Sequence, residues 1–320
     1  MGIKIKDKIS YKGEKAVSIE NEILHCTILP QRGAKIVSLK LKVQSGPSNY
    51  VEALSQISTE EYRVSVEYDR PFIGEDGSGF DDMLPNIDTC NILDESGQSM
   101  HLPDHGEVWS RPWEQVVSKD AVCFTIKGTV FPYSFTKVIS LHENEMVVNY
   151  SIDNKSAYRI PFQWAAHALF KINTSCKLNV PEHLTSIYNV HAGTTLPEAP
   201  KVYSFPYPFE KESLDLRVMP KKNNQGAQKY WFSDPLEKGE CGIIDFEREL
   251  KTSLHFNPKE LPWLGIWVNE GGWHNGYNIG IEPSTCWLDS PLDAMRSNRA
   301  SFLNAWEKKN WDIRIKLEQF

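Results

Sequence analysis

The stretch Met146-Val147-Val148-Asn149-Tyr150-Ser151-Ile152 decides the fold class of this chain. Every second residue from Met146 to Ile152 is apolar, and the run stops at the turn-forming sequence Asp153-Asn154-Lys155-Ser156. A period of two puts alternate side chains on opposite faces of an extended strand, whereas a helix needs a period near 3.6. The stretch therefore predicts a β-strand with one buried face.

The same period recurs along most of the chain. It predicts further strands at residues 16–19, 23–29, 35–42, 122–127, 242–246, 277–281 and 313–317. Helical patterning is confined to residues 58–63 and 291–308, where Ser290 is a candidate N-cap and Pro291 a candidate first residue. No repeat, low-complexity tract or Gly/Ser linker divides the chain. These features predict a single all-β domain over residues 1–320, a large antiparallel β-sandwich with few short helices.

Composition and charge exclude several classes of partner. Lys and Arg number 35 against 42 Asp and Glu, and the net charge of −7 lacks the basic excess that nucleic acids and anionic membranes attract. No run approaches the roughly 18 apolar residues of a transmembrane helix. The six cysteines are scattered without a CxxC pair, which is typical of reduced thiols in the cytoplasm. We expect a cytoplasmic monomer or homodimer with no nucleic-acid or membrane partner.

Two histidines stand in contexts that favour chemistry. His105 lies between the turn sequence Leu102-Pro103-Asp104 and Gly106, which indicates a position at the end of a strand rather than in a core. His167 stands in the largely apolar, strand-like run of residues 162–170. A hydrogen-bonded core histidine is the alternative interpretation of His167.

Carboxylates mark two further segments. Within the predicted strand that ends near Pro283, Glu282 shares a face with Gly280, and the missing side chain of Gly280 would let a ligand reach the carboxylate. A solvated glutamate at a strand end is the alternative. A glycine-rich loop over residues 77–85 carries the paired carboxylates Asp81 and Asp82. The ten tryptophans add aromatic faces that suit sugar rings, although most are expected to fill the core.

Taken in chain order, these segments resemble the aldose 1-epimerase (galactose mutarotase) superfamily. Residues 29–39 are similar to the family's N-terminal strand pair, and His105-Gly106 resembles its first active-site His-Gly. Residues 164–170 are similar to the family's Asn-His-x-Phe strand. Leu264-Gly265-Ile266-Trp267, followed by Ile281-Glu282-Pro283 and Asp289, resembles the stretch that ends in the catalytic glutamate. The resemblance runs from about residue 16 to residue 317 and implies the family's large antiparallel β-sandwich.

The family interconverts the α and β anomers of a sugar by opening its ring. A base takes the proton of the C1 hydroxyl while an acid protonates the ring oxygen, and a carboxylate with an imidazole can do this near neutral pH. The resemblance implies that Glu282 is the base and His167 the acid. The implied sugar contacts are His105, Asp82 and Trp267. The implied partner is a small-molecule sugar, and no cofactor or metal is expected.

Two departures from the family pattern bear on the substrate. Asp81-Asp82 stands at about the spacing of the family's sugar-binding Asn-Arg pair, which reverses the charge there. Gln228-Lys229-Tyr230-Trp231-Phe232 stands where typical members carry an Asp. Because the residues that read sugar hydroxyls differ, we expect a substrate other than plain galactose.

Three alternatives remain open. The first is a non-catalytic carbohydrate-binding or sensing protein of the same fold. The second is a glycoside hydrolase or lyase, in which Asp81 or Asp82 would supply the second carboxylate that hydrolysis usually needs. The third is a hexose-6-phosphate epimerase, with Arg70, Arg111 and Lys229 around the phosphate. Carboxylates on the same loops disfavour a phosphate dianion and favour a neutral or amino sugar.

Overall fold

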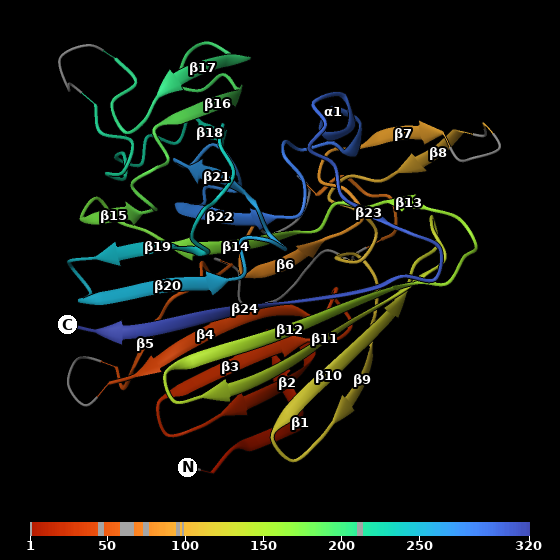
Figure 1. The fold of residues 1–320 in the computed structure, drawn as a ribbon. Coiled ribbons are helices and arrows are strands. Elements are labelled where there is room, and N and C mark those ends of the chain that lie inside the picture. The colour runs from red at the N-terminus through yellow and green to blue at the C-terminus, as the bar shows by residue number, and fades with distance from the viewer. Residues whose placement is uncertain are drawn as a thin grey trace.

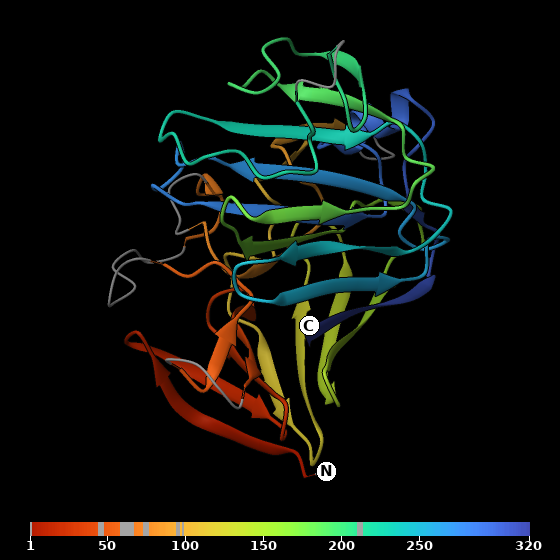
Figure 2. The ribbon, with the colours of Figure 1, turned by 90° about the vertical axis from the view of Figure 1, so that its left-hand side faces the viewer.

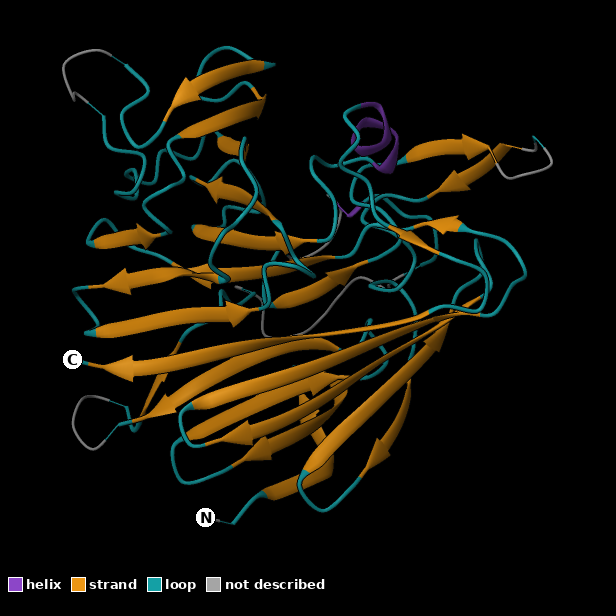
Figure 3. Ribbon diagram, in the orientation of Figure 1, coloured by secondary structure: helices purple, strands orange, loops and turns teal. Residues whose placement is uncertain are grey.

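The structure is a computed structural model that describes residues 2–43, 48–57, 67–72, 77–93, 97, 99–209 and 214–320. Within these ranges strands dominate, and one short α-helix, α1 (Pro291–Arg296), is present (Figure 3). The strands form two large antiparallel sheets that pack against each other, as two views at right angles show (Figure 1, Figure 2). This arrangement confirms the predicted all-β sandwich.

The larger sheet has 12 strands, in the spatial order β1-β2-β3-β4-β6-β14-β22-β21-β18-β16-β17, with β5 beside β4. Its strands are β1 (Lys4–Tyr11), β2 (Glu14–Glu20), β3 (Leu24–Leu29), β4 (Lys35–Lys42), β5 (Tyr50–Glu52), β6 (Phe80–Met83), β14 (Ala165–Lys171), β16 (Ser186–His191), β17 (Lys201–Ser204), β18 (Ala227–Phe232), β21 (Trp263–Asn269) and β22 (Asn278–Ser284). Its N-terminal strands β1 to β4 lie in the lower part of the view of Figure 1, where strands β9 to β11 of the other large sheet also lie.

The smaller sheet has 8 strands, in the order β15-β19-β20-β24-β12-β11-β10-β9. Its strands are β9 (Glu114–Val117), β10 (Ala121–Lys127), β11 (Tyr133–His142), β12 (Glu145–Asn154), β15 (Cys176–Asn179), β19 (Glu240–Asp245), β20 (Leu250–Phe256) and β24 (Lys308–Gln319). Two short pairs complete the described strands, β7 (Cys90–Leu93) with β8 (Ser99–Leu102) and β13 (Ile160–Pro161) with β23 (Phe302–Leu303).

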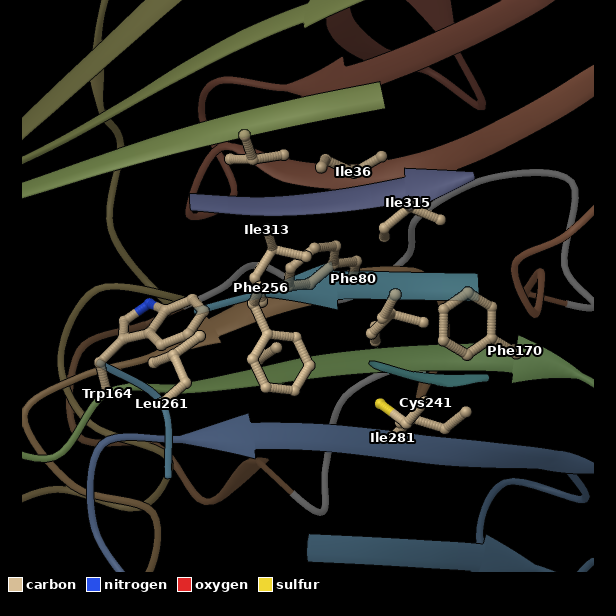
Figure 4. Packing of buried hydrophobic residues seen from close by; sticks show 14 of the residues in the cluster. Ile36, Phe80, Trp164, Phe170, Cys241, Phe256, Leu261, Ile281, Ile313 and Ile315 are labelled. Carbon is tan, nitrogen blue, oxygen red and sulfur yellow. The ribbon is translucent and has the colours of Figure 1, made fainter. Parts of the chain in front are cut away.

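The hydrophobic core lies between the two large sheets. Ile36, Phe80 and Ile281 of the larger sheet belong to the same buried cluster as Ile313 and Ile315 of the smaller sheet (Figure 4). In strands such as β10, every second side chain is buried in this way, which is the pattern that predicted the strand. Each large apolar side chain buried contributes about 1.5–3 kcal/mol to folding, so the alternation commits one face of each strand to the core.

The predicted strands are confirmed, because every stretch with a period of two overlaps an observed strand. The predicted helix over residues 291–308 is right at its start, where Ser290 caps the chain and accepts a hydrogen bond from the Leu292 N–H. It is wrong beyond Arg296, since Asn298 takes a left-handed φ of 57° and the chain turns toward β23. The helix predicted over residues 58–63 lies outside the described residues.

The cysteines carry free thiols. Burial raises the pKa of both Cys176 and Cys286 to about 12, which leaves them as unreactive thiols at neutral pH. Among the described residues, no helix combines the length and the apolar character needed to cross a lipid bilayer.

Asp82 points into the core. On β6, Asp81 pairs with His167 of β14 and Asp82 with Ala166, so the two neighbouring carboxylates face opposite sides of the sheet. The Asp82 carboxylate accepts hydrogen bonds from Lys137 Nζ at 2.6 Å and from Trp164 Nε1 at 3.1 Å. The expectation that Asp82 contacts a sugar is therefore corrected. Asp82 faces the core, whereas Asp81, one residue earlier, faces the opposite side of the sheet.

Replacing Lys137 by Met should destabilise the fold by about 3–5 kcal/mol, because the Asp82 charge would remain buried without its counter-ion. The side chains of Lys137 and Asp82 are 1% and 0% exposed. Urea-induced unfolding of the two proteins measures the difference in free energy. The double variant Lys137→Met/Asp82→Leu should recover a large part of the loss, because it removes both charges.

The matched control is the surface pair Arg314 and Asp312, whose side chains are 54% and 34% exposed. Arg314→Met should lower the free energy of unfolding by no more than about 1 kcal/mol, since solvent already screens this pair. Equal losses in Lys137→Met and Arg314→Met would contradict the role given to the buried pair.

Candidate active site

Four neighbouring strands of the larger sheet present polar side chains on the face that points away from the core. Between β18 and β21, Lys229 pairs with Trp267, and between β21 and β22, Gly265 pairs with Glu282. Strand β14 adjoins β22 and adds His167 on the same face. Antiparallel pairing thus gathers residues that lie far apart in the sequence.

A cavity of about 410 Å³ opens on this face. Its volume lies in the range of small-molecule sites. The lining residues are Phe72, Gly77, Ile87, Asp88, Asp104, His105, His167, Leu169, Val190, His191, Lys229, Trp267, Asn269, Trp273, His274, Asn278, Glu282 and Asp289. The strands supply Glu282, His167 and Lys229, and the loop that follows β8 supplies Asp104 and His105.

Glu282 is fully buried at this cavity. Its Oε2 accepts a hydrogen bond from Lys229 Nζ, whereas its Oε1 has no partner among the described residues. Gly280 leaves space beside this oxygen, since a Cβ at position 280 would lie 3.1 Å from Oε1. Burial raises the pKa of Glu282, and the ammonium of Lys229 opposes the rise. A carboxylate whose pKa moves toward neutrality is a better general base than an ordinary one.

Lys229 is the only lysine or arginine among the described residues that line the cavity. Its Nζ contacts Glu282 and lies 3.4 Å from Asp289 Oδ1. Burial alone would lower the pKa of Lys229, but the charges of these two carboxylates outweigh burial and raise it. Lys229 is therefore an ammonium whose charge is already shared between two carboxylates.

Two imidazoles and Phe72 form an aromatic cluster beside the cavity. His105 stacks on Phe72 with ring centroids 4.1 Å apart, and the His167 ring meets both edge-on, 5.2 Å from His105 and 4.9 Å from Phe72. Within the described part of the chain, His167 Nδ1 has no hydrogen-bond partner. Burial, followed by the charges of His105, Lys229 and Lys35, lowers the pKa of His167 well below 6.5. The resting imidazole of His167 is therefore neutral at pH 7.

Asp104 holds His105 in place. One Asp104 oxygen lies 2.8 Å from His105 Nδ1, and the other accepts a hydrogen bond of 2.8 Å from the Phe72 N–H. Burial alone would raise the pKa of Asp104, but these hydrogen bonds and the charge of His105 outweigh burial and lower it. Gly106 allows the loop its close approach, because a Cβ there would lie 2.1 Å from the Leu84 carbonyl oxygen and φ is 74°.

Trp267 and Trp273 give the cavity an aromatic wall, with ring centroids 5.9 Å apart and planes inclined at 61°. Trp109 packs against Phe72 instead and donates its Nε1–H to the Asp104 carbonyl at 3.0 Å. Trp267 and Trp273 are thus available to a ligand, while Trp109 supports the loop that carries His105.

The structure brings together four of the residues that the sequence singled out. Glu282, His167, His105 and Trp267 all line the cavity. Strand β22 continues through Pro283 to Ser284, so Glu282 is a buried strand residue rather than a solvated strand end. The interpretation of His167 as a hydrogen-bonded core histidine does not fit a ring whose Nδ1 has no partner among the described residues.

Other sequence-based candidates lie elsewhere. Asp81 forms an ion pair with Lys35 at 2.9 Å, and Arg111 donates to Glu107 at 3.0 Å; neither Asp81 nor Arg111 lines the cavity. Asp88 lies in no recognisable motif, so the sequence alone gives no signal that it is a site residue. The turn that follows β6 places Asp88 at the cavity.

Several solved structures have an architecture similar to that of this chain. The match to Slr1438 from Synechocystis sp. PCC 6803 covers 98% of this chain and 99% of Slr1438, with a TM-score of 0.72 and 14% identity. A galactose mutarotase-like protein from Lactobacillus casei matches over 95% of this chain and 100% of its own, with a TM-score of 0.70 and 17% identity. The fold is galactose mutarotase-like.

A galactose mutarotase related enzyme from Lactobacillus acidophilus has the same galactose mutarotase-like fold, with a TM-score of 0.68 and 16% identity over 95% of this chain and 97% of its own. No family model matches the sequence, and no curated protein matches it. At these identities the similarity establishes the fold, and the chemistry of the site rests on this chain's own residues.

The His167 imidazole should remain neutral far below pH 6.5 in the folded protein. An NMR titration of the histidine ring protons measures this directly, with the His167 signal assigned by its loss in His167→Asn. The exposed ring of His142 serves as the reference for a histidine in contact with solvent. Below pH 6.5 the His167 imidazole binds a proton in the unfolded chain but not in the folded protein. The free energy of unfolding should therefore fall as the pH drops below 6.5. Titration of His167 near 6.5 would contradict its buried, cation-flanked environment.

Proposed function

We propose that this protein is a carbohydrate-active enzyme that interconverts the anomers of an aldose. The observation that carries the proposal is the buried Glu282 carboxylate, whose Oε1 is unpartnered among the described residues at a cavity that it shares with His167. A buried polar atom without a partner loses the free energy of a hydrogen bond, which a ligand hydroxyl would restore. The galactose mutarotase-like fold and the aromatic wall at Trp267 support the same conclusion.

In the proposed reaction, Glu282 Oε1 accepts the proton of the C1 hydroxyl while the bond between C1 and the ring oxygen breaks. An imidazole donates a proton to that oxygen, which gives the open-chain aldehyde. Rotation about the C1–C2 bond and the reverse proton transfers close the ring as the other anomer, so substrate and product have the same composition. Each positioned proton transfer contributes about 10²–10⁴-fold to the rate.

Two histidines stand where the acid would act, His105 and His167. The sequence resemblance gives the role of acid to His167, yet its lowered pKa makes the imidazolium unfavourable there. His105 has a carboxylate 2.8 Å from its Nδ1 and lies next to His167, with ring centroids 5.2 Å apart. We therefore assign the contact with the ring oxygen to the pair of histidines rather than to His167 alone.

One observation favours a second candidate function, carbohydrate binding without catalysis. The ammonium of Lys229 binds Glu282 Oε2 and offsets the negative charge that a base needs. A binding protein would use the same cavity and the same hydrogen-bonding groups without proton transfer. The two functions differ in a single measurable property, the rate of anomer exchange.

The structure gives less support to the remaining alternatives. A hydrolase would need Asp81 or Asp82 at the sugar, but Asp82 lies in the core and Asp81 is paired with Lys35. A phosphate-binding site would need Arg111 and Lys229. Arg111, however, forms an ion pair with Glu107, and the ammonium of Lys229 already contacts two carboxylates.

Glu282→Gln should slow anomer exchange by about 10²–10⁴-fold while sugar affinity changes little, because the amide keeps the shape of the side chain but cannot act as the base. Exchange spectroscopy between the two anomeric NMR signals measures the rate, and thermal stabilisation by the same sugar measures binding. Glu240→Gln, at an exposed position of β19, is the matched control.

Wild-type exchange rates in Glu282→Gln would remove Glu282 from the role of base. Saturable binding of a sugar by the wild-type protein, with no acceleration of anomer exchange, would establish the non-catalytic alternative instead.

Lys229→Met should move the acid limb of the pH–rate profile to higher pH. Loss of the ammonium removes the interaction that opposes the raised pKa of Glu282, so that pKa rises further. The base works only when it is deprotonated, and the rate therefore falls at a higher pH than in the wild type. Profiles of kcat/KM against pH measure the shift, with the exposed Lys119→Met as control. An acid limb that does not move would contradict the coupling between Lys229 and Glu282.

A further inference from the structure

Carboxylates outnumber cations around the cavity. The acidic lining residues of the described chain are Asp88, Asp104, Glu282 and Asp289, against Lys229 as the only lysine or arginine. His167 adds no compensating charge, because its pKa is lowered well below 6.5. The cavity therefore has a negative potential before any ligand enters.

Three of these carboxylates have a cationic or hydrogen-bonding partner in the protein. Asp104 is held by His105 and by the Phe72 N–H. Glu282 and Asp289 share Lys229, and Asp289 also accepts a hydrogen bond of 3.2 Å from Trp231 Nε1. These groups need no ligand for their charge to be tolerated.

Asp88 is the exception. Its backbone N–H donates to the Asp289 carbonyl at 2.7 Å, which places the two aspartates side by side. Among the described residues, none donates a hydrogen bond or forms an ion pair with the Asp88 carboxylate, which is accessible from the cavity. Asp88 is an exposed residue where it lines the cavity. Partial burial of its carboxylate and the nearby charge of Asp289 raise the pKa of Asp88 to about 6. A positive group entering the cavity would relieve this repulsion.

Glu282 Oε1 points independently to a ligand at the same place. This oxygen is buried, and no described residue donates to it. Lys229 links Glu282 to Asp289, because its Nζ contacts both carboxylates. The cavity thus offers a hydrogen-bond acceptor for a hydroxyl at Glu282 and, elsewhere on its lining, a carboxylate that has no partner among the described residues.

We propose that the sugar bound in this cavity carries an ammonium group, which pairs with Asp88 next to Asp289. This inference rests on the proposed function and names its substrate class, an amino sugar. The ammonium occupies the position that the protein leaves without a cation, while a hydroxyl of the same sugar meets Glu282 Oε1. A phosphorylated sugar is disfavoured, because its dianion would meet the four carboxylates of the lining and one ammonium that already contacts two of them.

A metal ion is the other cation that carboxylates commonly bind. The described residues contain no group of three or more His, Cys, Asp or Glu side chains arranged to hold a metal ion. Two adjacent aspartates with one free carboxylate suit a single positive charge that brings its own hydrogen-bond donors, as an alkylammonium does.

The test compares aldoses that differ only in the charge of one substituent. The probes are glucose, its derivatives with an amine at C2, C3 or C6, and the N-acetylated form of each, which keeps the nitrogen but removes the charge. Exchange spectroscopy gives kcat/KM for anomer exchange, and thermal stabilisation gives binding. At least one amine should exceed its N-acetyl form and the parent sugar by roughly tenfold or more, as expected for a charged hydrogen bond.

Asp88→Asn should reduce that ratio toward one, and Asp120→Asn, which removes the same charge from the exposed turn between β9 and β10, should leave it unchanged. Raising the pH above the pKa of the amine should abolish the preference, because a neutral amine keeps the shape but loses the charge. A preference that survives at high pH or in Asp88→Asn would overturn the ion pair.

The outcomes separate this inference from the proposed function. Equal exchange of amino, N-acetylated and parent sugars would overturn the ammonium site and leave the anomer-exchange function standing. Amine-selective stabilisation that is lost in Asp88→Asn, without accelerated exchange, would support the ammonium site and overturn the proposed catalysis. If no amino sugar stabilises the protein and none has its anomer exchange accelerated, the ammonium site is overturned.

Discussion

The alternation of side chains along β14, β18, β21 and β22 is the constraint on which the rest of the structure depends. One set of positions, which includes Ile266 and Ile281, packs against the smaller sheet. The other set, which includes Trp267 and Glu282, lines the cavity. A register shift of one residue in any of these strands would exchange the two sets. The core and the site are therefore specified by the same pairing of strands.

Burial at the cavity moves the pKa values of Glu282 and His167 toward each other. Burial raises the pKa of Glu282 and lowers that of His167, so both groups are driven toward their neutral forms. Lys229 limits this for the carboxylate, and Asp104 supplies a negative charge beside His105. Groups whose proton affinities are brought closer together exchange protons with a substrate more readily than ordinary surface side chains do.

Much of the fold could be predicted from sequence because the signal is local. A period of two identifies a strand without knowledge of its neighbours, and the Ser290-Pro291 pair identifies the start of a helix. The site could be predicted only in part. Glu282 and the histidines stand in distinctive contexts, but the side of the sheet on which Asp82 lies depends on its pairing with Ala166. The contact of Lys229 with Glu282 depends on pairings across β21, and no short motif encodes them.

The separation of the two faces has a consequence for how such a protein can change over generations. A substitution of an outward-facing residue such as Trp267 opens no void between the sheets. The residues that line the cavity can therefore change one side chain at a time while the sandwich persists. The similarity of this chain to Slr1438 over nearly its whole length, at only 14% identity, is an example of a fold that is retained while most residues differ.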